Sequence, residues 1–199
     1  YICSFPGQKT LIVCPTSLAY NWQDEFQKFA PSIRTCIVQG TPEEREALIS
    51  GQDGEYDVWI TTYPLIRKDT ESYQKQKYDH IFLDEAQFIK NPSSLGAKEV
   101  KSIPADHRFA LTGTPIENAL SELWSIFDFI MPGFFMKYSR FADAYEKPIL
   151  KEHDQNKMKE LRTRIQPFVL RRMKKEVLKE LPDKIETKRM AEMTAKQKK

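Results

Sequence analysis

The sequence has few of the residues that build disulfide frameworks or metal centres. Its 199 residues include three cysteines, Cys3, Cys14 and Cys36, and no CxxC pair. An odd number of scattered cysteines is typical of reduced thiols, which indicates a cytosolic or nuclear protein. The three histidines stand apart from one another and from the cysteines. This separation argues against a structural zinc site.

Long apolar runs are also absent. No run approaches the roughly 20 residues that a membrane-spanning helix needs. Residues 1–6 lack the basic flank of a signal peptide, and no internal repeat is present. Hydrophobic residues make up 40% of the chain and charged residues 30%. These values are ordinary for a globular protein, and the length suits one large domain or one domain with a small addition.

The charge is unevenly distributed along the chain. Residues 151–199 contain 16 Lys and Arg against 8 Asp and Glu, whereas the rest of the chain contains 15 against 20. A basic C-terminal quarter is suited to a polyanionic partner such as DNA. A solvated helical face would show the same excess, and charge alone does not separate the two interpretations.

Short β-rich segments alternate with helical patterns up to about residue 131. The predicted strands are residues 10–14, 34–38, 57–61, 81–83 and 108–111. The predicted helices start at residues 18, 42, 65, 95 and 120, with Thr16 or Ser17 capping the first and Asn118 the last. Leu18, Trp22, Phe26 and Phe29 would form the apolar face of the first helix. Such alternation predicts an α/β fold with a parallel sheet flanked by helices.

The pattern changes after Pro132 and Gly133, which should stop the last of these helices. We therefore predict one domain at residues 1–133 and a second part, a small helical protrusion, at residues 134–199. Residues 134–151 look irregular and aromatic, and a helix follows at residues 158–168. A basic helix ending at Pro182 and a strand at residues 185–190 would complete the chain.

Two adjacent carboxylates follow the fourth predicted strand. The apolar run Ile81, Phe82, Leu83 leads directly into Asp84 and Glu85. A buried parallel strand would deliver these acids to its C-terminal edge, where phosphoryl-transfer sites hold magnesium and the attacking water. A surface strand ending in a solvated acidic turn would give the same pair, so the prediction depends on partners elsewhere in the chain.

Three other predicted strands end in small polar residues. These are Pro15-Thr16-Ser17, Thr61-Thr62 and Thr112-Gly113-Thr114. Hydroxyls at a strand end can contact sugar-phosphate oxygens, and a glycine between two threonines permits a tight path. Taken alone, Thr61-Thr62 favours a helix N-cap and the third motif favours a simple turn, and the first motif offers a natural helix N-cap as well.

Taken in order, the segments CPTSLAYNW, ITTYPLIR, LDEAQFIKNP and LTGTPIENAL resemble the Swi/Snf-type ATPases, a branch of the superfamily-two helicase-like translocases. In that family these are motifs Ia, Ib, II and III of the first RecA-like lobe. The segments ELWSIFDFIMPGFF and PFVLRRMKKEVLKELPDK are similar to the family's stretch between its two lobes. The resemblance spans nearly the whole chain, and it implies a RecA-like sheet of the P-loop NTPase type.

The resemblance also implies roles for individual residues. Asp84 would hold ATP-bound Mg²⁺ through water, and the catalytic residues would be Glu85, which polarises the attacking water, and Gln87. Gln87 stands where the family often has histidine, and its amide cannot titrate. Gln87 and the loop Thr112, Gly113, Thr114 would couple the nucleotide site to DNA. The implied DNA contacts are Pro15, Thr16, Ser17, Asn21, Thr61, Thr62, Arg171, Arg172, Lys174 and Lys175.

Two parts that such an ATPase needs are not found among these 199 residues. No glycine-rich phosphate cradle of the form GxxxxGK[ST] is present, and Gly7-Gln8-Lys9-Thr10 does not supply one. A second RecA-like lobe, with its arginine finger, is not found either. We therefore expect the parent protein to be an ATP-dependent double-stranded DNA translocase or remodeller, and the 199 residues alone to be inactive.

The expected partners are double-stranded DNA, the parent's second lobe and, further, DNA-bound proteins. No membrane partner is expected. The compartment would be the cytoplasm, on the nucleoid, in a bacterium and the nucleus in a eukaryote.

Two other classes remain open. One is a non-catalytic lobe that binds DNA or protein, and the intact acidic pair and the threonines Thr112 and Thr114 count against it. The other is an RNA helicase of the DEAD-box kind, which would carry a DEAD tetrad and a serine-alanine-threonine motif, and Gln87 with the TGTP sequence points away from it.

Overall fold

The computed structural model describes residues 1–52, 55–113 and 120–172. The predictions made for Thr114, Asn118, Lys174 and Lys175, for the helix ending at Pro182 and for a strand at residues 185–190 lie outside them. The chain divides into two compact units, Tyr1–Lys157 and Met158–Lys199. The functional division at residue 133 stays a prediction.

Five parallel strands form one sheet in the first unit. They are β1 (Thr10–Cys14), β2 (Thr35–Ile37), β3 (Val58–Thr62), β4 (Tyr78–Leu83) and β5 (Ala105–Ala110), in the order β2-β3-β1-β4-β5. The predicted parallel sheet is confirmed. The middle strand is β1, and the strand that precedes the acids lies one place from the edge, between β1 and β5.

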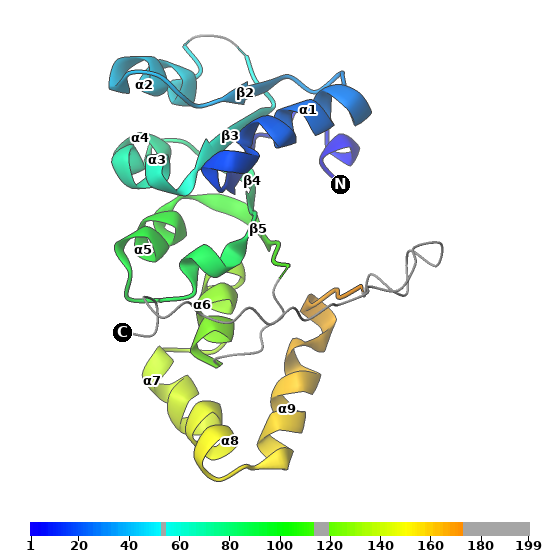
Figure 1. The fold of residues 1–199 in the computed structure, drawn as a ribbon, viewed down its shortest axis with the longest axis vertical. Helices are drawn as coiled ribbons and strands as arrows, with labels where there is room; N and C mark the ends of the chain where they lie inside the picture. Colours follow the sequence, from blue (N-terminus) through cyan, green and yellow to red (C-terminus); the bar gives the residue numbers. More distant parts are fainter. Residues whose placement is uncertain (53–54, 114–119, 173–199) are drawn as a thin grey trace, which may run out of the picture. The chain divides into compact units, whose positions relative to one another are not determined.

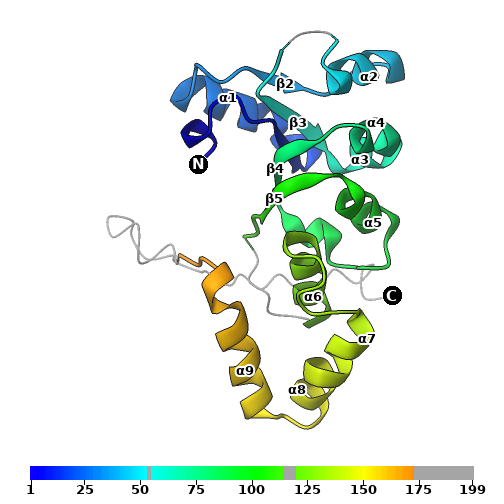
Figure 2. The same cartoon turned by 180° about the vertical axis from the view of Figure 1, so that it is seen from behind.

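Helices connect the strands and continue after the sheet. The α-helices are α1 (Ala19–Phe29), α2 (Pro42–Ser50), α3 (Tyr63–Lys68), α4 (Thr70–Gln74), α5 (Leu95–Ser102), α6 (Leu120–Ile130), α7 (Tyr138–Phe141), α8 (Lys147–Lys151) and α9 (Gln155–Ile165). Short turns of other helix types are η1 (Ile2–Ser4), η2 (Thr16–Leu18), η3 (Ala86–Ile89), η4 (Ala142–Glu146) and η5 (Gln166–Phe168). In the first unit, α1 lies on one face of the sheet, and α3, α4 and α5 lie on the other (Figures 1 and 2).

Alternate strand residues supply two separate cores, because successive side chains of a strand point to opposite faces. Leu11 and Val13 of β1 face the larger core, with Ile66 of α3 and Val100 of α5. Ile12 faces the smaller core under α1. All five residues of β1 are buried, as expected for the middle strand of a sheet covered on both faces.

The start of α1 differs from the prediction. Neither Thr16 nor Ser17 makes a side-chain cap, and both lie in η2, which precedes the helix. Leu18, Trp22 and Phe26 pack on the sheet as predicted, but Phe29 is 69% exposed. Phe29 is the last residue of α1.

The helix predicted from residue 65 to 73 is split into α3 and α4 at Asp69. The side chain of Asp69 accepts two hydrogen bonds from the guanidinium of Arg45, at 2.6 Å to Nε and 2.7 Å to Nη2. Arg45 is buried and also donates from Nη1 to the carbonyl of Gly40. This ion pair ties α2 to the break in the helix.

Residues 134–151 were predicted to be irregular, and this prediction is wrong. They contain α7, η4 and α8 in succession. Phe141, Tyr145 and Ile149 are buried at intervals of four, which is the helical period. Pro148 lies near the start of α8, which directly continues the π-helical turn η4.

Helix α6 is buried on two sides. Ile126 and Phe129 pack into the larger core, while Phe127 contacts the rings of Phe134 and Phe135. The sequence pattern predicts one apolar face for this helix, and that face combines residues of both sides, since Ile130 packs on the larger core and Phe127 does not; its members are Leu120, Leu123, Trp124, Phe127 and Ile130.

Within the described residues, no helix combines the length and the apolar character required to cross a bilayer.

Candidate nucleotide and DNA site

Asp84 and Glu85 lie at the C-terminal edge of the sheet. Asp84 follows the last residue of β4, and its backbone N–H donates to the carbonyl of Val13 in β1 at 2.8 Å. On the other side, Leu111 donates to the carbonyl of Leu83 at 2.7 Å. Both acids are half-buried. The predicted position of the acidic pair, between the ends of β1 and β5, is therefore confirmed.

The backbone turns sharply at Glu85. Its φ of 51° and ψ of 55° are left-handed, a conformation that a residue with a side chain adopts at a cost of about 1–3 kcal/mol. Neighbouring bonds hold this turn: the Glu85 N–H donates to Asp84 Oδ1 at 2.9 Å, and the next N–H, of Ala86, donates to the Leu111 carbonyl at 2.8 Å. The turn sends β4 into η3 and separates the two carboxylates.

A chain of hydrogen bonds joins Glu85 to the end of β5. The Gln87 amide donates from Nε2 to Glu85 Oε2 at 2.6 Å, and its Oε1 accepts from the Thr112 hydroxyl at 2.9 Å. Because an amide is both donor and acceptor, Gln87 can bridge a carboxylate and a hydroxyl at the same time. The structure thus joins three of the residues predicted for catalysis and coupling. Gly113 is exposed beside Thr112.

Asp84 has two further neighbours that the sequence analysis did not predict. The indole N–H of Trp22, on α1, donates to Asp84 Oδ2 at 2.9 Å. The hydroxyl of Tyr63 donates to the Asp84 carbonyl at 2.8 Å, and the Tyr63 ring is stacked on Phe88 at 4.8 Å. Trp22 was interpreted only as a core residue, although an indole N–H in a partly buried position needs an acceptor. Tyr63 directly follows the Thr61-Thr62 motif, and this position at a strand end was the one feature of the sequence that could have indicated a place for Tyr63 beside the acids.

The local electrostatics keep the neighbouring groups in their neutral forms. Burial, and then the charge of Asp84, raise the pKa of the Cys14 thiol to about 12. Burial raises the pKa of the Tyr63 phenol above its ordinary value, and Asp84 adds to the effect. Cys14 and Tyr63 therefore bring no negative charge to compete with the two carboxylates near neutral pH.

The residues present fit a magnesium–nucleotide complex rather than a closed metal cage. In the part of the chain that the structure describes, no three His, Cys, Asp or Glu side chains gather as metal ligands. Mg²⁺ in phosphoryl-transfer sites uses one or two carboxylates, water and the phosphates themselves. The Asp84 carboxylate has about four acceptor positions, and two of them are used by Trp22 and Glu85. The remainder can accept hydrogen bonds from metal-bound water.

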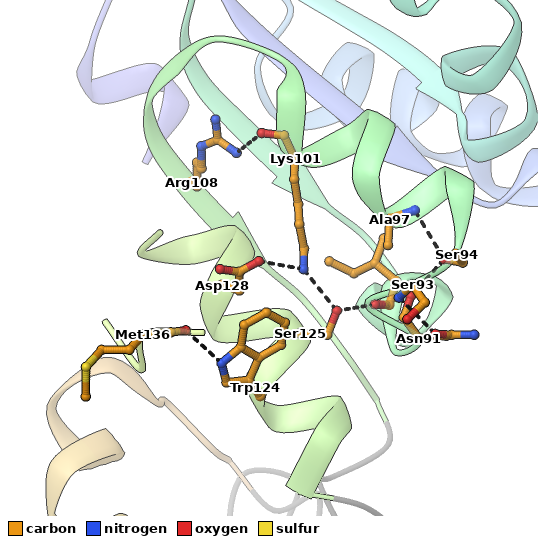
Figure 3. A network of polar contacts seen from close by, with 11 residues as sticks. Asn91, Ser93, Ser94, Ala97, Lys101, Arg108, Trp124, Ser125, Asp128 and Met136 are labelled. Atoms are coloured by element: carbon orange, nitrogen blue, oxygen red, sulfur yellow. Dashed lines mark hydrogen bonds and ion pairs between the residues drawn. The ribbon is translucent and has the colours of Figure 1, made fainter. Parts of the chain in front are cut away.

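The turn η3 is anchored to α6 by a polar network (Figure 3). The Ser125 hydroxyl, fully buried, donates to the Ile89 carbonyl at the end of η3 at 2.6 Å. The ammonium of Lys101 donates to Ser125 Oγ at 3.2 Å and to Asp128 Oδ2 at 2.9 Å. This network fixes the C-terminal end of the segment that carries Gln87.

A surface hollow of about 520 Å³ lies beside this network. Lys101, Trp124 and Asp128 contribute to its lining. None of the residues predicted for the site borders it. The acidic pair therefore lies at the edge of the sheet and not in this hollow.

Three of the six DNA contacts predicted at the sheet edge are exposed. Thr16, Ser17 and Asn21 are exposed on η2 and the first turn of α1, and Pro15 is half-exposed. They follow β1, whose end is paired with the β4 segment that leads to Asp84. Arg171 and Arg172 are exposed and belong to the second unit.

Thr61 does not fit the predicted role. Its side chain is fully buried, and its hydroxyl accepts a hydrogen bond from Tyr73 at 2.7 Å. Thr62 is buried as well, with 6% of its surface exposed, and it makes no side-chain cap for α3. We therefore leave Thr61 out of the proposed DNA contacts. The Thr61 hydroxyl instead accepts the hydrogen bond of the buried Tyr73 phenol.

Comparisons with known proteins agree with this geometry. The sequence matches the SNF2-related domain over residues 4–199. The TATA-binding protein-associated factor MOT1 of Saccharomyces cerevisiae is 39% identical over 187 residues, covering 88% of this chain and 10% of MOT1. An uncharacterized ATP-dependent helicase of Mycoplasma pneumoniae is 40% identical over 187 residues, covering 94% of this chain and 18% of the helicase.

A solved structure shows the same fold. The Sulfolobus solfataricus SWI2/SNF2 ATPase core in complex with dsDNA superposes with a TM-score of 0.76 at 39% identity, over 90% of this chain and 37% of that one. The predicted RecA-like fold is thereby confirmed. The chain spans less than a fifth of the length of the two curated relatives. The match over residues 4–199 and the shared fold together show that this chain belongs to the SNF2-related domain family.

Proposed function

We propose that the full-length protein is an ATP-dependent translocase or remodeller that couples ATP hydrolysis to movement on double-stranded DNA. The observation that carries the proposal is the connected arrangement of Asp84, Glu85, Gln87 and Thr112 at the sheet edge. A degenerate binding lobe has no need for two carboxylates held in fixed and different positions.

In the proposed hydrolysis the two acids have separate tasks. Asp84 would hold Mg²⁺ through the water bound to the metal. Glu85 would accept a proton from the water that attacks the γ-phosphate as the bond between this phosphate and ADP breaks. Bound Mg²⁺ would neutralise charge on the phosphates. The bond from Gln87 restricts the Glu85 carboxylate to one orientation, and this positioning is the main contribution that a protein makes to phosphoryl transfer.

DNA would be held by its backbone. The exposed residues Thr16, Ser17 and Asn21 can donate hydrogen bonds to phosphate oxygens, which position a protein on DNA without reading its sequence. Arg171 and Arg172, together with the basic composition of residues 151–199, would add salt-dependent attraction. Lys174 and Lys175 stay predicted contacts of the same kind.

The proposed partners follow from this mechanism. They are ATP with Mg²⁺, double-stranded DNA, a second RecA-like lobe of the same polypeptide, and DNA-bound proteins. The protein would work on the nucleoid of a bacterium or in the nucleus of a eukaryote.

The proposal is tested by comparing nucleic acids as activators. Phosphate release by the full-length protein is measured with Mg-ATP alone, with duplex DNA and with single-stranded RNA. We expect duplex DNA to stimulate turnover strongly and RNA to do so weakly. Stimulation by RNA alone would favour an RNA helicase. A protein that binds DNA without any hydrolysis would favour a non-catalytic lobe.

A further inference from the structure

We propose that Trp22 is a positioning residue of the nucleotide site: its indole N–H orients the Asp84 carboxylate for metal-bound nucleotide. The inference rests on the proposed function and adds a residue to it. The contact is a hydrogen bond of 2.9 Å between Trp22 Nε1 and Asp84 Oδ2, and it joins α1 to the end of β4 across 62 residues of sequence.

The orientation of this carboxylate is not set by its backbone alone. The Asp84 N–H is bonded to Val13 and its carbonyl to Tyr63, so the main chain is fixed by the neighbouring elements. The side chain can still rotate about its own bonds. Asp84 Oδ1 accepts from the next residue's N–H, a contact within the same turn. Within the described residues, the side chain from another element that hydrogen-bonds this carboxylate is Trp22, and it fixes the second oxygen.

The indole itself is well anchored. Trp22 packs on the smaller core, beside Phe26 with ring centroids 6.3 Å apart. It is half-buried, so its apolar ring is held by the sheet and its N–H is at the rim. A rigid donor of this kind restricts its acceptor more strongly than a flexible lysine would, because an indole has only two side-chain torsions.

The donor also suits the chemistry of the site. An indole N–H is neutral and donates only, so it can orient Asp84 without cancelling the negative charge that attracts a metal. Groups that hydrogen-bond metal-binding side chains matter greatly: their loss typically lowers metal affinity or activity by about 10–100-fold.

Loss of the Trp22 hydrogen bond should weaken only the part of the nucleotide affinity that depends on Mg²⁺. Asp84 contacts nucleotide through the metal, so Trp22 should affect affinity only when Mg²⁺ is present. Asn21, an exposed residue proposed to contact DNA, is adjacent to Trp22 on the same helix. The helix α1 therefore carries both a DNA contact and the residue that orients Asp84.

The test measures affinity of the full-length protein for a fluorescent, non-hydrolysable ATP analogue, with Mg²⁺ and with EDTA. The ratio of the two dissociation constants is the gain in affinity due to the metal. Trp22→Phe keeps an aromatic ring and removes the donor. We expect it to lower this gain by about tenfold, at the lower end of the range for such contacts, and to leave the affinity in EDTA unchanged.

A matched control is Trp124→Phe. Trp124 also donates its indole N–H, to the Met136 carbonyl at 3.2 Å, and it does not contact Asp84. The gain should stay at the wild-type value in this variant. Trp22→Met, which also fills space without a donor, serves if Trp22→Phe does not fold.

Three results would overturn the inference. One is an unchanged gain in Trp22→Phe, and another is an equal loss of affinity with Mg²⁺ and with EDTA, which would indicate a merely structural role. The third is a wild-type protein that shows no metal-dependent gain. That third result contradicts the proposed function as well, whereas the first two leave it intact as long as the wild type hydrolyses ATP.

Discussion

The bridge made by Gln87 gives the sharpest quantitative prediction. Its amide donates to Glu85 Oε2 at 2.6 Å and accepts from the Thr112 hydroxyl at 2.9 Å. Gln87→Leu removes both bonds and keeps a side chain of similar size. Thr112→Val removes the outer bond and leaves the bond between Gln87 and Glu85 in place. The two variants therefore separate the contact with the catalytic carboxylate from the contact with the loop after β5.

The magnitudes follow from the kinds of hydrogen bond. A bond to a charged group contributes about 1.5–3 kcal/mol, and a neutral bond about 0.5–1.5 kcal/mol. Each 1.36 kcal/mol of lost transition-state stabilisation is a factor of ten in rate. Thr112→Val should therefore lower turnover by about 2–10-fold, and Gln87→Leu, which loses the bond to Glu85 as well, by at least about 10–150-fold.

Steady-state phosphate release at saturating Mg-ATP and duplex DNA measures these effects. Gln74→Leu is the matched control, because Gln74 donates an amide bond of 2.6 Å to Ser102 ahead of the N-terminal ends of β4 and β5, at the edge of the sheet opposite to the acids. Its turnover should equal that of the wild type. Wild-type turnover in Gln87→Leu, or a larger loss in Thr112→Val than in Gln87→Leu, would refute the reasoning.

Three further predictions concern stability, measured as the free energy of unfolding in urea. Asp69→Asn should lower the free energy of unfolding by about 3 kcal/mol, because it leaves the buried guanidinium of Arg45 without its counter-ion. Replacing both residues with apolar ones should lower the free energy of unfolding by less. Ser125→Ala should cost about 1–3 kcal/mol, because the buried Ile89 carbonyl loses its donor; a change below 0.5 kcal/mol would show that this anchor is unimportant. Burial, and then the neighbouring His107, lower the pKa of His80, so the unfolded chain binds a proton more readily than the folded one. Stability should therefore rise with pH between that lowered pKa and the unfolded value of about 6.5, and His80→Phe should lose less stability on acidification from pH 7 to 5 than the wild type.

The position of the acidic pair could be predicted from the sequence because the alternation of strands and helices indicated a parallel sheet, and motifs elsewhere in the chain indicated partners for the pair. An apolar run followed by Asp84 and Glu85 needs only a parallel sheet around it to place the acids at the C-terminal edge. The polar ends of β1 and β5 then come to the same edge, whatever the order of the strands. The order itself is a tertiary property, so the central place of β1 was not visible.

Other features depended on contacts between distant segments. The helical spacing of Trp22 and Phe26 predicted an apolar helix face that packs on the core. Only the fold shows that the indole N–H of Trp22 reaches Asp84. Thr61 looked like a surface hydroxyl because the sequence does not show that Tyr73 covers it. By contrast, the helical spacing of Phe141, Tyr145 and Ile149 was present in the sequence and was missed, because the many aromatic residues of this segment were interpreted as irregular structure.

The central claim is that Glu85 activates the attacking water. Its most direct test is Glu85→Gln in the full-length protein, a change that keeps the size of the side chain and removes the proton acceptor. We predict that DNA-stimulated phosphate release is abolished while affinity for duplex DNA stays at the wild-type value. Sustained turnover in this variant would contradict the role given to Glu85.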